Sequence, residues 1–141
     1  MDKPAPLLAV EIHALREAFA ALNRDDISAF IRLLDPQVKW IETDLPQGGT
    51  YRGLSAVEAH LSQARASWAE GSCEPQGFVA AGDRIIVFLH VHVRLKHETA
   101  WREGHIADVF TFRDGKAIEK RYFVDGGKAL EWAGVEPPDE N

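Results

Sequence analysis

Apolar residues in the first part of the chain recur at steps of three and four positions. Over residues 7–22 they are Leu8, Ile12, Leu15, Phe19 and Leu22. This spacing predicts a helix with one buried stripe, because residues three and four apart lie on the same side of a helix. Asp26 can cap a second, short helix that runs to Leu34, and Pro36 ends it.

A strand, a loop and a third helix are predicted next. Residues 38–42 predict a short strand, and the Pro- and Gly-rich residues 45–49 predict a loop that Gly53 closes. Residues 55–68 predict a helix whose buried side is formed by Val57, Leu61, Ala64 and Trp68. The first half of the chain is therefore mainly helical.

The second half changes to a period of two, which is the period of a strand. In residues 85–95 every odd position is aliphatic, whereas the even positions include His90, His92 and Arg94. Residues 106–112 and 117–124 predict a hairpin around Asp114–Gly115, and residues 129–133 predict a last helical turn. We expect the aliphatic face of the long strand to point inward.

Three helices followed by mostly antiparallel strands predict an α+β fold, with three N-terminal helices packed on a curved, mixed sheet. A twisted sheet that curls around helices leaves a conical cavity, which is a natural site for a ligand. The length of 141 residues predicts a single domain over residues 1–141, with frayed tails at 1–6 and 136–141.

Composition excludes several classes of partner. Sixteen Lys and Arg against 22 Asp and Glu give a net charge of −6, so we expect neither nucleic acid nor an anionic membrane as a partner. No apolar run reaches the roughly 18–20 residues of a membrane span. The first residues lack the pattern of a signal peptide. Cys73 is the one cysteine, so no internal disulfide forms, and we expect a cytoplasmic protein.

Four local motifs resemble the nuclear transport factor 2-like (NTF2-like) superfamily, in particular its SnoaL-like polyketide cyclase and ketosteroid isomerase-like branch. They are Thr50–Gly53, Asp108–Lys116, Arg121–Phe123 followed by Asp125, and Ala129–Val135. The resemblance covers nearly the whole chain. It implies a cone-shaped roll of the cystatin and NTF2-like type, a homodimer formed through the outer sheet face, and chemistry without a cofactor.

The same resemblance implies two carboxylates. The isomerases place a general-base Asp nine residues before the glycine that opens the third helix, and this spacing from Gly53 gives Asp44. They keep a protonated Asp on the penultimate strand before a Val, which corresponds to Asp108 ahead of Val109. They also donate a hydrogen bond from a Tyr on the first helix, but this chain has no Tyr there; the position falls near Ala18.

The strand pattern around Asp108 supports a buried carboxyl group. Asp108 shares its strand face with the apolar side chains Ile106, Phe110 and Phe112. A buried Asp must be paired or protonated, because an isolated charge in an apolar environment is costly. The alternative is a structural ion pair with a basic residue of a neighbouring strand, the candidates being Arg94, Lys120 and Arg121.

Asp44 and Glu42 are alternative bases. Asp44 lies in a Pro/Gly loop, where a carboxylate often only stabilises a turn. If the first strand extends through this stretch, Trp40, Glu42 and Asp44 share one face, and Glu42 is the second candidate for the acid/base.

Lys120 and Tyr122 fall on the strand face that lines the cavity in the family. Tyr122 could donate its hydroxyl to a substrate oxygen. In the epoxide hydrolases of this fold a catalytic Asp lies near the position of Tyr122, and its absence here disfavours that activity. Further expected binding residues are Ile106 and Phe110 on the strand. An aromatic rim is expected from Trp40, Tyr51, Trp68 and Trp101.

The histidines of the long strand are expected on the outer sheet face. His90 and His92, with Glu98 and His105, faintly resemble the metal ligands of cupins. A cupin does not begin with three helices, and a metal site needs three or more convergent ligands. We therefore expect no metal here, and a polar row at a homodimer contact instead.

The sequence leaves three functions open. The first is a cofactor-free isomerase or cyclase in which Asp44 or Glu42 removes a proton beside a carbonyl and protonated Asp108, helped by Tyr122, donates to the developing enolate oxygen. The second is a non-catalytic module that binds a small apolar or carbonyl-containing ligand. The third is an epoxide hydrolase-like enzyme.

Overall fold

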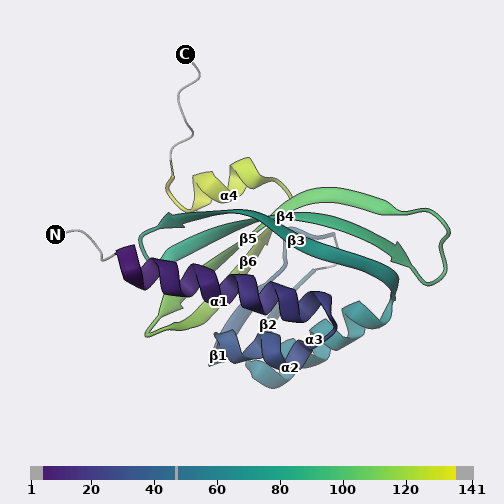
Figure 1. Cartoon of the computed structure of the whole chain (residues 1–141), viewed down its shortest axis with the longest axis horizontal. Coiled ribbons are helices and arrows are strands. Elements are labelled where there is room, and N and C mark those ends of the chain that lie inside the picture. The colour runs from purple at the N-terminus through teal and green to yellow at the C-terminus, as the bar shows by residue number, and fades with distance from the viewer. Residues whose placement is uncertain (1–4, 47, 136–141) are drawn as a thin grey trace, which may run out of the picture.

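The computed structural model describes residues 5–46 and 48–135 (Figure 1). The helices are α1 (Ala5–Asn23), α2 (Ile27–Phe30), the 3₁₀ turn η1 (Ile31–Leu33), α3 (Leu54–Ala66) and α4 (Gly126–Trp132). The strands are β1 (Leu34–Ile41), β2 (Thr50–Arg52), β3 (Trp68–Ala81), β4 (Arg84–Leu95), β5 (Arg102–Arg113) and β6 (Lys116–Phe123). Within these residues, no helix has the length and apolar character needed to span a membrane.

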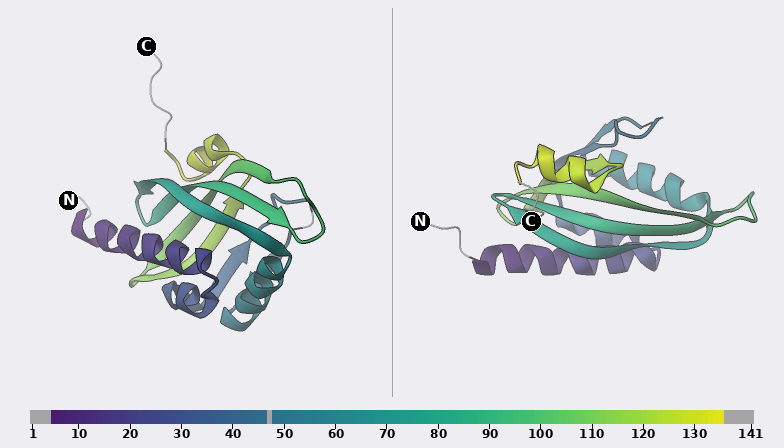
Figure 2. Two further views of the ribbon diagram at one scale, coloured as in Figure 1. Left: turned by 45° about the vertical axis from the view of Figure 1, so that its right-hand side comes forward. Right: turned by 90° about the horizontal axis from the view of Figure 1, so that it is seen from above.

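The six strands form one mixed sheet in the order β2-β1-β6-β5-β4-β3. Only β1 and β6 pair in parallel, and every other neighbouring pair is antiparallel. Helix α1 lies against one face of the sheet, on the same side as α2 and α3, whereas α4 lies against the other face (Figure 2). This arrangement confirms the predicted α+β class with three helices on a curved, mixed sheet.

The main core lies between α1 and the inner face of the sheet. Phe19 of α1 packs edge-on against Phe110 of β5, with 6.2 Å between ring centroids. The odd positions Ile85, Val87 and Leu89 are buried in this core, which confirms that the aliphatic face of β4 points inward. A smaller core under α4 contains Ala129 of this helix and three buried residues of the opposite sheet face, namely Ile86, Ala107 and Val109.

The hairpin turn between β5 and β6 is the one that the sequence predicts. Asp114 and Gly115 both have positive φ angles, of 54° and 82°. A two-residue turn with two positive φ angles matches the twist of the strands that it joins.

The second predicted helix is shorter than expected. Only residues 27–30 are α-helical, and a 3₁₀ turn follows before β1 starts at Leu34. Asp35 and Pro36 lie inside β1, where the pairing with β6 shifts register between Leu34 and Lys39. Proline has no N–H to donate to a strand ladder, so it is tolerated at such an irregularity.

Strand β3 was not predicted. Its sequence has no regular pattern, because it is interrupted by Gly71, Pro75 and Gly77. The segment nevertheless pairs with β4 along its whole length. The register of this pairing shifts between Trp68 and Glu70 and again between Pro75 and Gly77. Because α3 ends at Ala66, Trp68 begins β3 instead of closing the helix. Cross-strand pairing thus overrides a weak local strand propensity.

Two smaller differences concern β2 and the chain ends. Residues 50–52 form β2 on the edge of the sheet, paired with residues 39–41 of β1. Ala5 and Pro6 belong to α1, although a frayed tail was predicted for 1–6. The predicted tail at 136–141 and the remaining residues of the first tail, 1–4, lie outside the described residues.

Candidate functional site

An ionic cluster is enclosed between β1, β5 and β6. Strand pairing sets Lys120 beside Trp40 of β1 and sets Tyr122 opposite Asp108 of β5. Side chains two residues apart on a strand share a face, so Lys120 and Tyr122 point the same way. The Lys120 ammonium lies 3.0 Å from Glu42 Oε2 and 3.6 Å from Asp108 Oδ1, and its side chain is only 2% exposed. One cation is therefore shared by two carboxyl groups.

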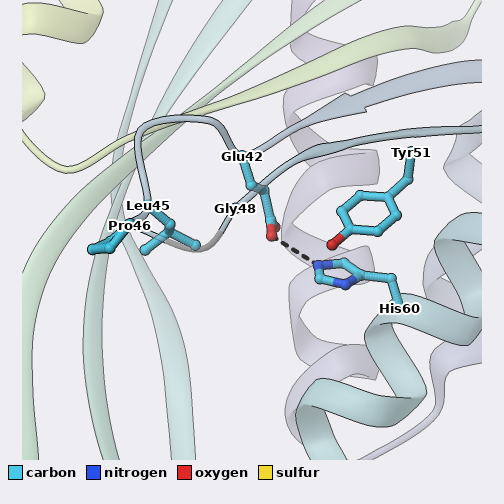
Figure 3. Close-up of a pocket in the computed structure, with 6 residues that line it drawn as sticks. All are labelled: Glu42, Leu45, Pro46, Gly48, Tyr51 and His60. Atoms are coloured by element: carbon cyan, nitrogen blue, oxygen red, sulfur yellow. Dashed lines mark hydrogen bonds and ion pairs between the residues drawn. The ribbon is translucent and has the colours of Figure 1, made fainter.

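Glu42, directly after β1, is held at both oxygens. Its Oε2 accepts hydrogen bonds from Trp40 Nε1 at 2.8 Å and from Lys120 Nζ at 3.0 Å. Its Oε1 lies 2.7 Å from His60 Nε2 of α3 (Figure 3). Burial raises the pKa of Glu42, but Lys120, the bond from Trp40 and the nearby His60 together lower it below its ordinary value. An ionised carboxylate only accepts hydrogen bonds, so Nε2 of His60 carries the proton.

The pKa of Asp108 is raised, whereas that of Glu42 is lowered. Burial raises its pKa, and this effect exceeds the lowering by Lys120, while the charge of Glu42 raises the pKa further. Its Oδ1 is buried and has no hydrogen-bond partner within the described part of the chain, because 3.6 Å to Lys120 exceeds hydrogen-bond length. Their surroundings thus drive the two pKa values apart, that of Asp108 upwards and that of Glu42 downwards.

The cluster borders a cavity of about 180 Å³ between the helices and the sheet. Its wall is mostly apolar and is formed by Phe19, Leu22, Phe30, Trp40, Glu42, Leu45, Leu61, Ala64, Arg65, Trp68, Cys73, Ile106, Asp108, Lys120 and Tyr122. Pockets for drug-sized ligands measure roughly 300–1,000 Å³, whereas a dry cavity of roughly 150 Å³ can hold benzene. The cavity therefore suits a compound of about one ring.

A surface hollow of about 390 Å³ adjoins this cavity. Glu42 and Leu45 line both spaces, so the Glu42 carboxylate lies between the interior and the surface. In the hollow, His60 stacks on Tyr51 with 4.0 Å between ring centroids. Figure 3 shows the Glu42 side chain pointing at His60, with Leu45 and Pro46 on the other side of the loop.

Seven of the ten predicted site residues line the cavity together: Trp40, Glu42, Trp68, Ile106, Asp108, Lys120 and Tyr122. Tyr51 lines the adjoining hollow instead, and Phe110 is buried in the main core. Asp44 lines neither the cavity nor the hollow. Its side chain is exposed, and its Oδ2 accepts a hydrogen bond of 2.8 Å from the backbone N–H of Val124.

Of the three cations proposed as partners of Asp108, only Lys120 forms an ion pair with it within the described residues. Arg94 pairs with Glu70, and Arg121 pairs with Glu119. Burial raises the pKa of Tyr122, and nearby Asp108 adds to this effect, so its phenol stays protonated and able to donate.

The outer sheet face carries the histidines. His90 Nε2 lies 2.7 Å from Glu103 Oε2, and the His90 ring lies near that of His105. Trp101 stacks on His92, so Trp101 does not belong to the expected aromatic rim of the cavity. No group of three or more ligating side chains with metal-binding geometry occurs in residues 5–46 and 48–135.

The sequence does not predict three residues around the cavity, namely His60, Arg65 and Cys73. On α3, His60 lies next to the buried Leu61, and Arg65 follows Leu61 by four residues, on the same side of the helix. A polar residue on or beside a buried stripe is the signal in the sequence that indicates such positions. Cys73 lies on the unpredicted β3, and burial raises the pKa of its thiol to about 12, with a further contribution from Asp108.

The chain is similar to known proteins in sequence profile and in fold. The profile of the SnoaL-like domain matches residues 15–120. No curated protein matches the chain. TerC, co-crystallised with polyporic acid, gives a TM-score of 0.72 at 23% identity, over 87% of this chain and 97% of TerC.

Two further solved structures show the same fold. An NTF2-like protein of unknown function from Burkholderia pseudomallei K96243 gives a TM-score of 0.73 at 22% identity, over 89% of this chain and 98% of that one. A protein with a ketosteroid isomerase-like fold from Catenulispora acidiphila DSM 44928, in complex with trimethylamine, gives 0.68 at 13% identity, over 89% and 93%. Since the family profile covers most of its length, the chain belongs to the SnoaL-like domain family and has an NTF2-like fold.

Proposed function

We propose that the chain binds a small, mostly apolar carbonyl compound in the cavity and catalyses proton transfer within it without a cofactor. Glu42 is the base and Asp108 is the hydrogen-bond donor. The observation that carries this proposal is the buried Oδ1 of Asp108, which has no hydrogen-bond partner among the described residues and lies on the same cavity wall as Glu42. Pairs of carboxyl groups whose pKa values are driven apart by their surroundings are suited to acid–base work.

The proposed reaction moves one proton and two pairs of electrons, the second pair being the C=O π electrons, which pass to the oxygen. Glu42 takes the proton from the carbon beside the carbonyl, and the C–H electrons form a carbon–carbon double bond. The carbonyl oxygen gains the negative charge and accepts a hydrogen bond from Asp108, with the Tyr122 hydroxyl as a second donor from the same wall. Return of the proton to another carbon gives isomerisation. Attack of the enolate on a second carbonyl gives a ring closure.

Lys120 provides a fixed positive charge beside both carboxyl groups during this transfer. It lies against both carboxyl groups, so it pairs with Glu42 before the transfer and remains close to the oxygen bound at Asp108 afterwards. Charge fixed in a site of low dielectric needs no reorganisation when the reaction occurs.

The low basicity of Glu42 restricts the substrate. Lys120, Trp40 and His60 stabilise its ionised form, so it is a weaker base than an ordinary glutamate. Proton transfer is efficient when the pKa values of donor and acceptor are close. The C–H bond must therefore be an acidic one, such as a carbon flanked by two carbonyl groups.

His60 is a positioning residue in this proposal. Its Nε2–H fixes the Glu42 carboxylate at the mouth of the cavity, and its ring is held by stacking on Tyr51. Structural neighbours give general support for a ligand in this fold, since TerC was solved with polyporic acid and the Catenulispora protein with trimethylamine.

A non-catalytic binding module is the second candidate. The observation in its favour is that both oxygens of Glu42 already have donors, so the Glu42–Lys120 pair is complete without a substrate. In that case the ligand binds against the apolar wall, and its affinity survives the replacement of both carboxyl groups by amides.

The test uses 5-nitrobenzisoxazole, a small bicyclic aromatic compound whose isoxazole ring opens when a base removes the proton on its C3 carbon. The N–O bond breaks and a coloured nitrophenolate forms. We expect the protein to accelerate this reaction and Glu42→Gln to lower kcat/KM by at least about 100-fold, the usual size of a general-base contribution.

Asp44→Asn is the matched control, because it removes a nearby carboxylate that lies outside the cavity, and we expect it to keep the activity. Circular dichroism shows whether each variant is folded. Equal losses in Glu42→Gln and Asp44→Asn, or no acceleration by the wild type, would overturn the assignment of the base. If Glu42→Gln and Asp108→Asn leave both the wild-type rate and the ligand affinity intact, the binding module is the better description.

A further inference from the structure

We propose that the cavity selects ring-sized ligands that carry a carboxylate, and that Arg65 is the residue that binds it. This inference rests on the cavity of the proposed function and names its substrate class more closely. The first observation is that Arg65 lines the same cavity as Asp108.

The surroundings of Arg65 leave one end of its guanidinium without a partner. The side chain leaves the last turn of α3 and is 13% exposed. The guanidinium lies over the Trp68 ring, 4.3 Å from its centroid. Its Nη1 is buried and has no hydrogen-bond partner within the described residues. A buried donor without an acceptor is costly, so a ligand oxygen at this position stabilises the complex.

The only ion-pair partner of Arg65 in the described part of the chain is a weak one. Asp25 Oδ1 lies 3.5 Å from Nε, beyond good hydrogen-bond length, and the Asp25 side chain is 72% exposed. Pairs between a buried cation and a solvated carboxylate are strongly screened. The positive charge of Arg65 is therefore poorly compensated on the side where the guanidinium is buried.

The other charges of the cavity compensate one another. Lys120 is paired with Glu42, and Asp108 is shifted towards its neutral form by burial. Of the two cations that line the cavity, Arg65 is thus the one whose carboxylate partner, Asp25, is exposed to solvent. An anionic group is the ligand chemistry that completes the charge balance, and a planar carboxylate fits the fork of a guanidinium best.

The two polar anchors, Arg65 and Asp108, border the same cavity, and Cys73 lines it with them. A ring between these anchors would contact the apolar wall and the Trp68 side chain. The volume of about 180 Å³ limits the ligand to about one ring with its substituents. A small cyclic or aromatic carboxylic acid fits these conditions.

The experiment compares benzoate with benzamide, which has the same shape and no charge, by isothermal titration calorimetry on the whole chain. We expect the wild type to bind benzoate at least about tenfold more tightly, the smaller end of what a charge-assisted hydrogen bond contributes. Arg65→Met keeps the apolar stem over Trp68 and removes the charge. We expect it to lose the preference and to bind both compounds with the affinity of benzamide.

Asp25→Asn is the matched control, because it removes the exposed partner of Arg65 without touching the cavity. We expect it to keep or increase the preference for benzoate. Equal affinities of the wild type for the two compounds, or a preference that persists in Arg65→Met, overturn the inference. Turnover of the neutral 5-nitrobenzisoxazole by the wild type reports on the proposed function separately, so either proposal can fail while the other holds. If neither compound binds, the inference fails as well.

Discussion

The ammonium of Lys120 lies 3.0 Å from the Glu42 carboxylate, and these two side chains are 2% and 14% exposed. The ammonium also lies over the Trp40 ring, 4.1 Å from its centroid. Removing one member of a buried ion pair leaves the other charge without compensation, which costs far more than the pair itself contributes. The pair therefore governs both the stability of the cavity and the ionisation of its carboxyl groups.

Replacing Lys120 by Met is expected to lower the free energy of unfolding by about 3 kcal/mol at neutral pH, because Glu42 is left as a buried, uncompensated charge. Lys120 lowers the pKa of Glu42, so its contribution is present above the ordinary pKa of 4.5 and is lost as the pH falls below it. Urea unfolding between pH 3 and 7 measures this difference. Lys128→Met, on the exposed surface, should change the stability by less than about 0.5 kcal/mol. A pH-independent loss in Lys120→Met would contradict the role of the pair.

Glu42→Gln is expected to lower the pKa of Asp108. The charge of Glu42 raises the pKa of Asp108, and without it Lys120 has Asp108 as its only carboxylate neighbour in the cluster. The ¹³C resonance of the Asp108 carboxyl, followed by NMR over a pH titration, reports the change directly. An unchanged or higher midpoint in the variant would show that the two carboxyl groups do not share the cation.

Asp108→Asn is expected to raise the melting temperature at neutral pH, since it removes a carboxyl group that burial disfavours in its ionised form. Its pKa is raised in the folded state, so the stability of the wild type falls as the pH rises from 3.8 through the folded pKa. The Asp108→Asn variant has no carboxyl group to ionise at this position, so it does not lose stability in this pH range. The difference in melting temperature, measured by calorimetry, should therefore vanish near pH 3.8 and grow towards neutral pH. A difference that grows towards acid pH would have the wrong sign for a buried neutral carboxyl.

Asp44→Ala tests the role that the structure gives to this exposed carboxylate. Its oxygen fixes the loop after β1 to the end of β6 through the N–H of Val124. Loss of this hydrogen bond should cost about 1 kcal/mol and speed the hydrogen exchange of the Val124 amide. Asp44→Asn keeps an acceptor oxygen and should leave the exchange nearly unchanged. If both variants exchange alike, the side chain does not hold the loop.

The sequence predicts much of the site because side-chain alternation on strands is a local property. Trp40 on β1 and Glu42 directly after it, and Lys120 and Tyr122 on β6, face the cavity as the period of two requires. Asp108 was expected to be buried for the same reason. Asp44 follows Glu42 by two residues, but the chain turns at residues 43–44, so the alternation no longer applies to it.

Other features depend on contacts between distant parts of the chain. His60 approaches Glu42 because α3 packs on β1, and no local pattern in α3 indicates which carboxylate it meets. Strand β3 has three residues that break regular structure, and its conformation is set by pairing with β4. The Arg65 and Cys73 positions in the cavity follow from these two elements. Tertiary context decides such cases, because local propensity is weaker than packing.

A substitution at Gly71 tests how closely the backbones of β3 and β4 approach each other. Its φ is +140°, and a Cβ at this position would lie 2.5 Å from the backbone oxygen of His92 and 2.6 Å from Val93 Cα. Both the backbone angle and the space exclude a side chain, so Gly71→Ala should lower the free energy of unfolding by about 2 kcal/mol or more. Gly77→Ala on the same strand is the matched control, because its Cβ would meet only Phe88 Cδ2 at 3.9 Å, which is ordinary contact. Chemical denaturation of the two variants should separate them clearly. Equal stabilities would mean that β3 can move away from β4 at Gly71, and the cavity wall at Cys73 would then be less rigid than the pairing indicates.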